Sequence, residues 1–152
     1  MAGRKKSKFD NKFRSISGSE SRIAGVREER EVKDDLPKLC LNFKDFDFSQ
    51  CPPGQTLSQW EEAGMLSKLM DKFISICSHN RIEAVQLKFL KIYGSFPANG
   101  YFKLPSHVQG EVDWGTIQRI GGQKPRLAGY IIGNVFYPVF LDRDHKFFPS
   151  QK

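Results

Sequence analysis

The chain has 152 residues, of which 24 are lysine or arginine and 17 are acidic, giving a formal net charge of +7. This length predicts one domain with a core of its own, and the basic balance favours a polyanionic partner. The charged N-terminus and the lack of a long apolar run argue against a signal peptide and a membrane span. Three cysteines without zinc-binding spacing favour a reducing, cytoplasmic setting.

Residues 1–36 are predicted to be a disordered charged tail ahead of a single α+β domain over residues 37–152. The tail has only isolated apolar residues, too few to offset the entropy of ordering it. Residues 1–22 hold seven basic residues and two acids. The start of the tail, with Arg4, Lys5 and Lys6, is predicted to contact nucleic acid. A solubilising tail and a segment that folds on a partner are the alternatives.

Two helices are predicted in the first half of the domain, after a short strand over residues 39–43. The first helix is expected from residue 57 to 78, because Ser58 and Glu61 form a capping-box pattern and apolar residues follow at helical spacing. The second is expected to begin at Asn80, with Glu83 as its capping partner, and to run to about Tyr93. Together they predict a helical hairpin that needs a sheet to cover its apolar face.

The C-terminal third is predicted to fold as a small antiparallel β-meander. Its strands are expected over residues 114–120, 127–132 and 135–141. Gly133-Asn134 is typical of a two-residue hairpin turn. Pro138 cannot donate to a ladder and indicates an edge strand or a bulge, and Gly129 indicates a bend or a close approach. The fold class expected is α+β, with the helices on one face of the sheet and the other face open.

A long loop, residues 95–112, separates the helices from the meander. It has no sustained apolar period, and loops of this length are often functional or mobile. Tyr101, Phe102, Lys103 and His107 are predicted either to line a site or to pin the loop to the domain.

Basic and aromatic residues interleave on the predicted meander. Cations contact phosphates and aromatic rings stack on unpaired bases, so this pattern is typical of RNA binding. The alternative is that the basic residues solvate the exposed face and the tyrosines pack. The residues predicted to bind nucleic acid in the domain are Arg119, Lys124 and Lys146.

The chain then reads Asp142-Arg143-Asp144-His145, residue types that suit acid–base chemistry. Neighbours in a strand point to opposite faces, so Asp144 and His145 would not face each other. The alternative interpretation is a polar strand end held by local hydrogen bonds of a turn. A metal at Asp142, Asp144, His145 and His107 would lack any recognised ligand spacing. We therefore expect no metal site and no other cofactor.

The order of the predicted elements, with the strings R-L-A-G-Y-I-I and G-N-V-F-Y-P-V-F-L and a basic, His-containing end, resembles the RelE and ParE superfamily of toxins over residues 57–150. The resemblance implies metal-independent cleavage of mRNA on the ribosome through the ribose 2′-OH, and a cognate antitoxin protein as partner. It makes catalytic candidates of Arg126, Tyr137, Arg143 and His145. The ending also resembles short bacterial proteins that share V-F-Y-x-V-F-L-D-x-D-H-K-F, which implies no function. A non-catalytic module that binds nucleic acid or protein is the alternative.

Overall fold

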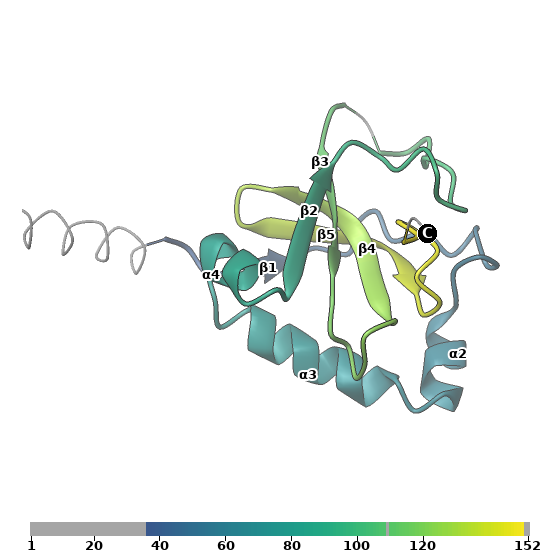
Figure 1. The fold of residues 1–152 in the computed structure, drawn as a ribbon, viewed down its shortest axis with the longest axis horizontal. Coiled ribbons are helices and arrows are strands. Elements are labelled where there is room, and N and C mark those ends of the chain that lie inside the picture. The colour runs from purple at the N-terminus through teal and green to yellow at the C-terminus, as the bar shows by residue number, and fades with distance from the viewer. Residues whose placement is uncertain (1–35, 109, 151–152) are drawn as a thin grey trace, which may run out of the picture. The chain divides into compact units, whose positions relative to one another are not determined.

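The computed structural model describes residues 36–108 and 110–150 (Figure 1). The predicted disordered tail, with Arg4, Lys5 and Lys6, therefore lies outside the described residues except for Leu36. The chain divides into the units Met1–Leu36 and Pro37–Lys152, and the second unit holds every helix and strand described below. This unit has an α+β fold, in which short helices accompany one five-stranded sheet.

The sheet has the strand order β1-β5-β4-β3-β2. Its strands are β1 (Cys40–Leu41), β2 (Leu90–Gly94), β3 (Asp113–Ile117), β4 (Arg126–Ile132) and β5 (Val135–Asp142). The predicted meander is confirmed as β3, β4 and β5, and Gly133, with φ +60°, begins the predicted hairpin turn. The sheet is nevertheless larger than predicted and mixed, because β2 adds an antiparallel edge and β1 pairs in parallel with β5.

The predicted helical hairpin is replaced by three short helices within the described residues, α2 (Leu57–Glu62), α3 (Leu66–Ile76) and α4 (Arg81–Gln86). The continuous first helix was a wrong prediction, because the chain breaks at Gly64, whose φ is +69°. The predicted cap at Ser58 is also wrong. Thr56 is the cap: its hydroxyl accepts from the Gln59 N–H at 3.2 Å, and the Gln59 side chain accepts from the Thr56 N–H at 2.9 Å.

Replacing Thr56 with alanine is expected to lower the free energy of unfolding by about 1 kcal/mol, because the first turn of α2 loses its capping acceptor. Ser58→Ala is the matched control, since Ser58 is exposed inside the helix and alanine is the better helix former. Denaturant unfolding of both variants measures the difference. An equal loss in Ser58→Ala would contradict the assignment of the cap to Thr56.

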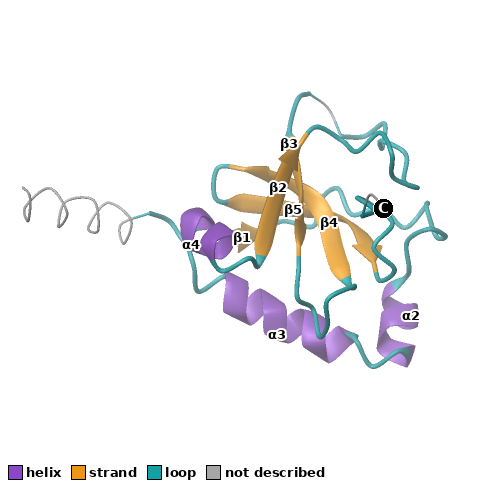
Figure 2. Ribbon diagram, in the orientation of Figure 1, coloured by secondary structure: helices purple, strands orange, loops and turns teal. Residues whose placement is uncertain are grey.

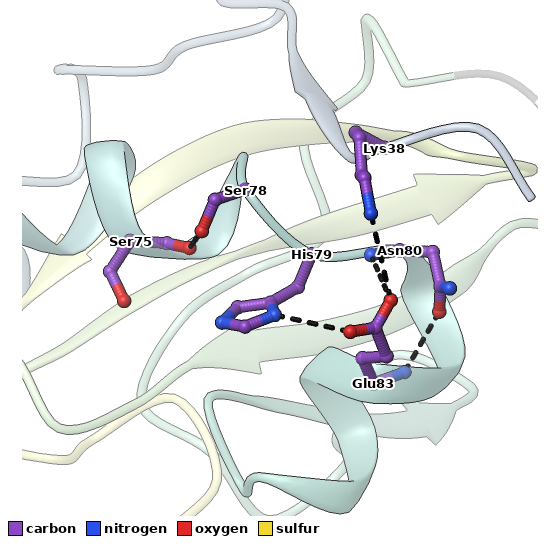
Figure 3. Close-up of polar contacts among 6 residues, drawn as sticks. All are labelled: Lys38, Ser75, Ser78, His79, Asn80 and Glu83. Atoms are coloured by element: carbon purple, nitrogen blue, oxygen red, sulfur yellow. Dashed lines mark hydrogen bonds and ion pairs between the residues drawn. The ribbon is translucent and has the colours of Figure 1, made fainter. Parts of the chain in front are cut away.

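The predicted capping box at the start of the second helix is confirmed. Figure 3 shows the Asn80 side chain accepting from the Glu83 N–H at 2.9 Å, while the Glu83 carboxylate accepts from the Asn80 N–H at 3.3 Å. Lys38 and His79 also contact this carboxylate, at 3.8 and 3.3 Å, and Ser78 donates to the Ser75 carbonyl at the end of α3. The network ties the segment that precedes β1 to the start of α4.

The predicted extension of this second helix to Tyr93 is wrong. The helix ends at Gln86, Lys88 takes a left-handed φ of +61°, and β2 follows as an edge strand beside β3. Leu90 and Ile92 both pack in the core. Apolar residues two positions apart are typical of a strand, and here they also fit the spacing of a helix. Pairing with β3 decided between the two patterns.

Both faces of the sheet are covered, so the prediction of an open face is wrong. On one face Leu69, Phe73 and Ile76 of α3 join the core, and Figure 2 shows α3 running alongside the sheet. On the other face Phe102 of the long loop and Phe147 near the C-terminus are buried in a second, mostly aromatic cluster. Phe102 therefore pins the loop. Within the described residues, no helix has both the length and the apolar character needed to cross a membrane.

Strand β5 contains the β-bulge that its proline predicts. Gly129 pairs with Pro138 and Ala128 with Phe140, which leaves Val139 as the extra residue. Val139 and Phe140 both pack in the second cluster although they are consecutive, because the bulge shifts the alternation of the strand. After the bulge the alternation resumes, and Leu141 packs in the first core.

Candidate functional site

A tight turn follows β5 and is held by the side chain that ends the strand. Asp142 is fully buried, and its carboxylate accepts from the N–H groups of Lys146 at 2.8 Å and Phe147 at 2.9 Å. Burial raises the pKa of Asp142, while these two N–H groups and the nearby Arg126 oppose that rise. Asp142 therefore anchors the turn. This agrees with the alternative interpretation of residues 142–145 as a strand end held by local hydrogen bonds.

The buried amide of Gln55 supports the same turn from the other side. Its Oε1 accepts from the Arg143 N–H at 2.7 Å and from the Trp60 indole N–H at 3.0 Å. Within the turn His145 adopts a left-handed φ of +58°. A side chain rarely takes this conformation unless its surroundings hold it there, so the position of His145 is set by Asp142 and Gln55.

His145 faces a cleft of about 440 Å³, called the His145 cleft below. The cleft is lined by Lys91, Tyr93, Gln118, Arg126, His145 and residues 148–150. Two of these side chains, Lys91 and Arg126, are basic, and none of the described lining residues is acidic. Such a cleft attracts anions, although the buried Asp142, which pairs with Arg126 across the sheet, offsets part of its positive charge.

Arg126 is the cleft cation with buried donor atoms. It starts β4 and pairs across the sheet with Asp142. Its Nε and Nη1 atoms are buried and have no hydrogen-bond partner among the described residues. Unsatisfied guanidinium donors are costly to bury, and a rotation of the side chain toward the cleft would let a bound anion accept from them.

An aromatic pair forms one wall of the cleft. The rings of Tyr93 and Phe148 stack with their centroids 4.0 Å apart and their planes at 19°, and the ammonium of Lys91 lies 5.1 Å from the Tyr93 centroid. Phe148 remains 36% exposed. An exposed aromatic ring beside cations offers a surface on which an unpaired base can stack.

The environment of His145 favours its neutral form. Burial lowers its pKa below the ordinary 6.5, and the positive charges of Arg126, Lys91 and Lys124 lower it further, against a hydrogen bond with the Phe148 backbone. At pH 7 the imidazole is therefore mainly uncharged and able to accept a proton.

We expect His145 to titrate below pH 6.5 in the free protein and at a higher pH once inorganic phosphate is bound. A nearby anion favours the imidazolium, so the pKa of His145 rises on binding. NMR titration of the imidazole signals with and without phosphate measures both values, and His145→Gln assigns the signal. An unchanged pKa of His145 in saturating phosphate would contradict an anion site here.

Of the four predicted catalytic residues, only Arg126 and His145 lie together in the cleft. Tyr137 stacks on Tyr130 in the second cluster, with centroids 4.7 Å apart and planes at 11°. Arg143 forms an ion pair with Asp144 at 3.5 Å. These two side chains do not line the His145 cleft.

The residues predicted to bind nucleic acid are also separated. Lys124 acts electrostatically on His145, whereas Arg119 lines a neighbouring groove that is described below. The ammonium of Lys146 lies 5.8 Å from the Tyr101 centroid. The structure thus keeps Lys124 near the cleft and places Arg119 and Lys146 elsewhere.

Sequence reasoning missed Lys91, Tyr93, Gln118 and Phe148 as cleft residues. Lys91 and Tyr93 fall within the predicted second helix, although they alternate with core residues of β2. Gln118 and Phe148 carry no local signal, because only the packing of the C-terminal segment beside β2 and β3 brings them together.

No group of three or more His, Cys, Asp or Glu side chains in residues 36–108 and 110–150 is arranged to hold a metal ion. His107, one of the four ligands considered, instead contacts the Asp45 carbonyl at 2.9 Å.

Comparisons with protein-family models, with curated proteins and with solved structures find no match to this chain.

Proposed function

We propose that the protein cleaves RNA at the His145 cleft by attack of a ribose 2′-OH on the adjacent phosphate. The observation that supports this most is the meeting of Arg126, Lys91 and His145 in one cleft without a carboxylate. Cations bind the phosphate, and a neutral imidazole accepts a proton. The stacked Tyr93 ring and Phe148 ring suit an unpaired base.

In the proposed reaction the 2′ oxygen forms a bond to phosphorus while the bond from phosphorus to the 5′ oxygen breaks. His145 accepts the proton of the 2′-OH, and the departing 5′ oxygen is protonated by the imidazolium or by water. The products are a 2′,3′-cyclic phosphate and a 5′-OH end. Arg126 and Lys91 stabilise the extra negative charge on the non-bridging oxygens during this step.

The resemblance to RelE-like toxins supports the same reaction class and suggests messenger RNA on the ribosome as the substrate. A cytoplasmic location and a cognate antitoxin belong to this proposal. A cognate antitoxin would prevent growth arrest when it is co-expressed with this protein. The product of a small neighbouring reading frame is the candidate to co-express.

Arg126→Gln is expected to reduce the cleavage rate about a hundredfold, because the phosphorane loses its buried cation. His145→Gln is expected to have an effect of similar size through loss of the proton acceptor. Primer extension maps cuts in ribosome-bound and naked RNA, and end analysis identifies the cyclic phosphate. Induced expression in a bacterial host reports growth arrest in parallel.

Lys103→Gln is the matched control, since it removes one positive charge from an exposed side chain that does not line the cleft. Circular dichroism and thermal unfolding show whether each variant is folded. Arg126→Lys keeps a charge opposite Asp142 and separates loss of chemistry from loss of stability. Wild-type protein that leaves both RNA substrates intact and does not arrest growth would refute the proposal.

A binding module without catalysis is the second candidate. It is favoured because His145 is the one histidine or carboxylic acid among the described residues that line the cleft, whereas cleavage is fastest when an acid and a base act together. In that case Arg126→Gln weakens RNA binding, while the wild type produces no cyclic phosphate at any pH.

A further inference from the structure

A second cationic depression lies between α3 and the loop that joins β3 to β4. This groove, called the Arg119 groove below, has a volume of about 360 Å³. Figure 1 shows the β3–β4 loop reaching α3, and a Cβ at Gly121 would lie 2.2 Å from the Lys68 side chain. The groove is lined by Lys68, Asp71, Lys72, Ser75, Arg119 and Gly121.

Two consecutive residues at the end of β3 link the cleft to the groove. The Gln118 N–H donates to the Phe89 carbonyl at 2.8 Å, which joins the end of β3 to the residue before β2. Gln118 lines the cleft, whereas the next residue, Arg119, has a φ of +60° and lines the groove. Their Cα atoms are about 3.8 Å apart, because they are consecutive. Residues 118–119 therefore border both depressions, the cleft on the face of the sheet that carries Phe147 and the groove beside α3 on the other face.

Two cations of the groove, Lys72 and Arg119, lie close enough to interact electrostatically. Lys72 lies with its ammonium 4.0 Å from the Phe89 centroid, and its pKa is lowered by burial and by the charge of Arg119. Neither Lys68, Lys72 nor Arg119 forms an ion pair within the part of the chain that the structure describes. Asp71 offsets one of the three charges, so a net positive groove remains.

We propose that the Arg119 groove is a second phosphate-binding site for the same single-stranded RNA, which passes around residues 118–119 with one phosphate in the cleft and a later one in the groove. This inference rests on RNA being the ligand of the His145 cleft. A single strand with flexible phosphates fits two cationic sites that are linked in this way, and the aromatic wall at Tyr93 and Phe148 favours a nucleic acid over an acidic peptide.

The double variant Lys72→Gln/Arg119→Gln tests the groove. The ligands are a 2′-O-methyl RNA of about twelve nucleotides, which resists cleavage and exceeds one site, and a dinucleoside monophosphate, which has a single phosphate. Fluorescence anisotropy measures the long ligand at several salt concentrations, and the NMR signal of His145 measures the short one. Lys38→Gln/Lys103→Gln removes the same charge from two exposed side chains and serves as the control.

The groove variant is expected to bind the long RNA about tenfold more weakly than the control variant. The slope of its affinity against salt is expected to fall by about 0.7 for each phosphate that the variant no longer neutralises. Binding of the short ligand at His145 should not change. Equal affinity of the groove and control variants for the long RNA would overturn the inference, as would equal losses for both ligands.

The two proposals fail in different ways. If the wild type binds the long RNA through the groove but never cleaves RNA, the proposed reaction fails and the groove stands. If the wild type binds neither RNA at low salt, both proposals fail. Polyglutamate that binds where RNA does not would overturn the groove as an RNA site and identify an acidic protein as its partner.

Discussion

Replacing Asp142 with alanine is expected to lower the free energy of unfolding by about 3 kcal/mol or more. The side chain is fully buried, and the loss leaves the N–H groups of Lys146 and Phe147 without their acceptor. Arg126 also loses the opposite charge across the sheet. Since whole domains are stable by only about 5–15 kcal/mol, chemical denaturation will show this change clearly.

Asp144→Ala is the matched control for Asp142→Ala. Asp144 has a 35% exposed side chain and a single ion pair with Arg143, so its loss should cost less than about 1 kcal/mol. The NMR signal of His145 adds a second measurement, because only Asp142→Ala should release the turn that holds the imidazole. A stable Asp142→Ala protein with an unchanged His145 signal would contradict the anchoring role of the carboxylate.

Gly129→Ala is expected to destabilise the protein by about 3 kcal/mol or more, or to prevent folding. A Cβ at this position would lie 2.1 Å from the Tyr137 carbonyl oxygen and 3.0 Å from the Phe136 ring. The first of these is backbone within the β4–β5 ladder, which cannot move without disturbing the bulge at Pro138. Thermal and denaturant unfolding measure the loss.

Gly122→Ala provides the control at a position with space. A Cβ there would have its nearest contact at 3.6 Å, with the Pro125 ring, and this loop residue has no left-handed φ. Alanine should be neutral or stabilising by up to about 1 kcal/mol, because it restricts the unfolded chain. Equal stability of the Gly129→Ala and Gly122→Ala proteins would show that β4 and β5 are not packed as described.

The C-terminal hairpin and its irregularities could be predicted from the sequence because their signals are local. Gly133-Asn134 predicts the turn, Pro138 predicts the bulge, and β-branched and aromatic residues predict the strands that flank them. The capping box of Asn80 and Glu83 is equally local, and the structure forms it. Each of these features depends on residues only a few positions apart.

The helical face expected up to Tyr93 shows the limit of such reasoning. Leu90 and Ile92 satisfy a helix and a strand alike, and hydrogen bonding to β3 selects the strand. The break at Gly64 is a similar case, since the apolar spacing continues from α2 into α3 and hides it.

The sequence by itself determined the α+β class, the β3–β5 meander and the chemical types that gather near His145. Only the tertiary structure decided which of those side chains meet, because Lys91 and His145 are brought together by strand pairing and by the buried Asp142 that fixes the turn. It also decided that Tyr137 packs in a core and that Arg143 pairs with Asp144. Contacts between distant segments depend on the packing of the whole domain, which local spacing does not encode.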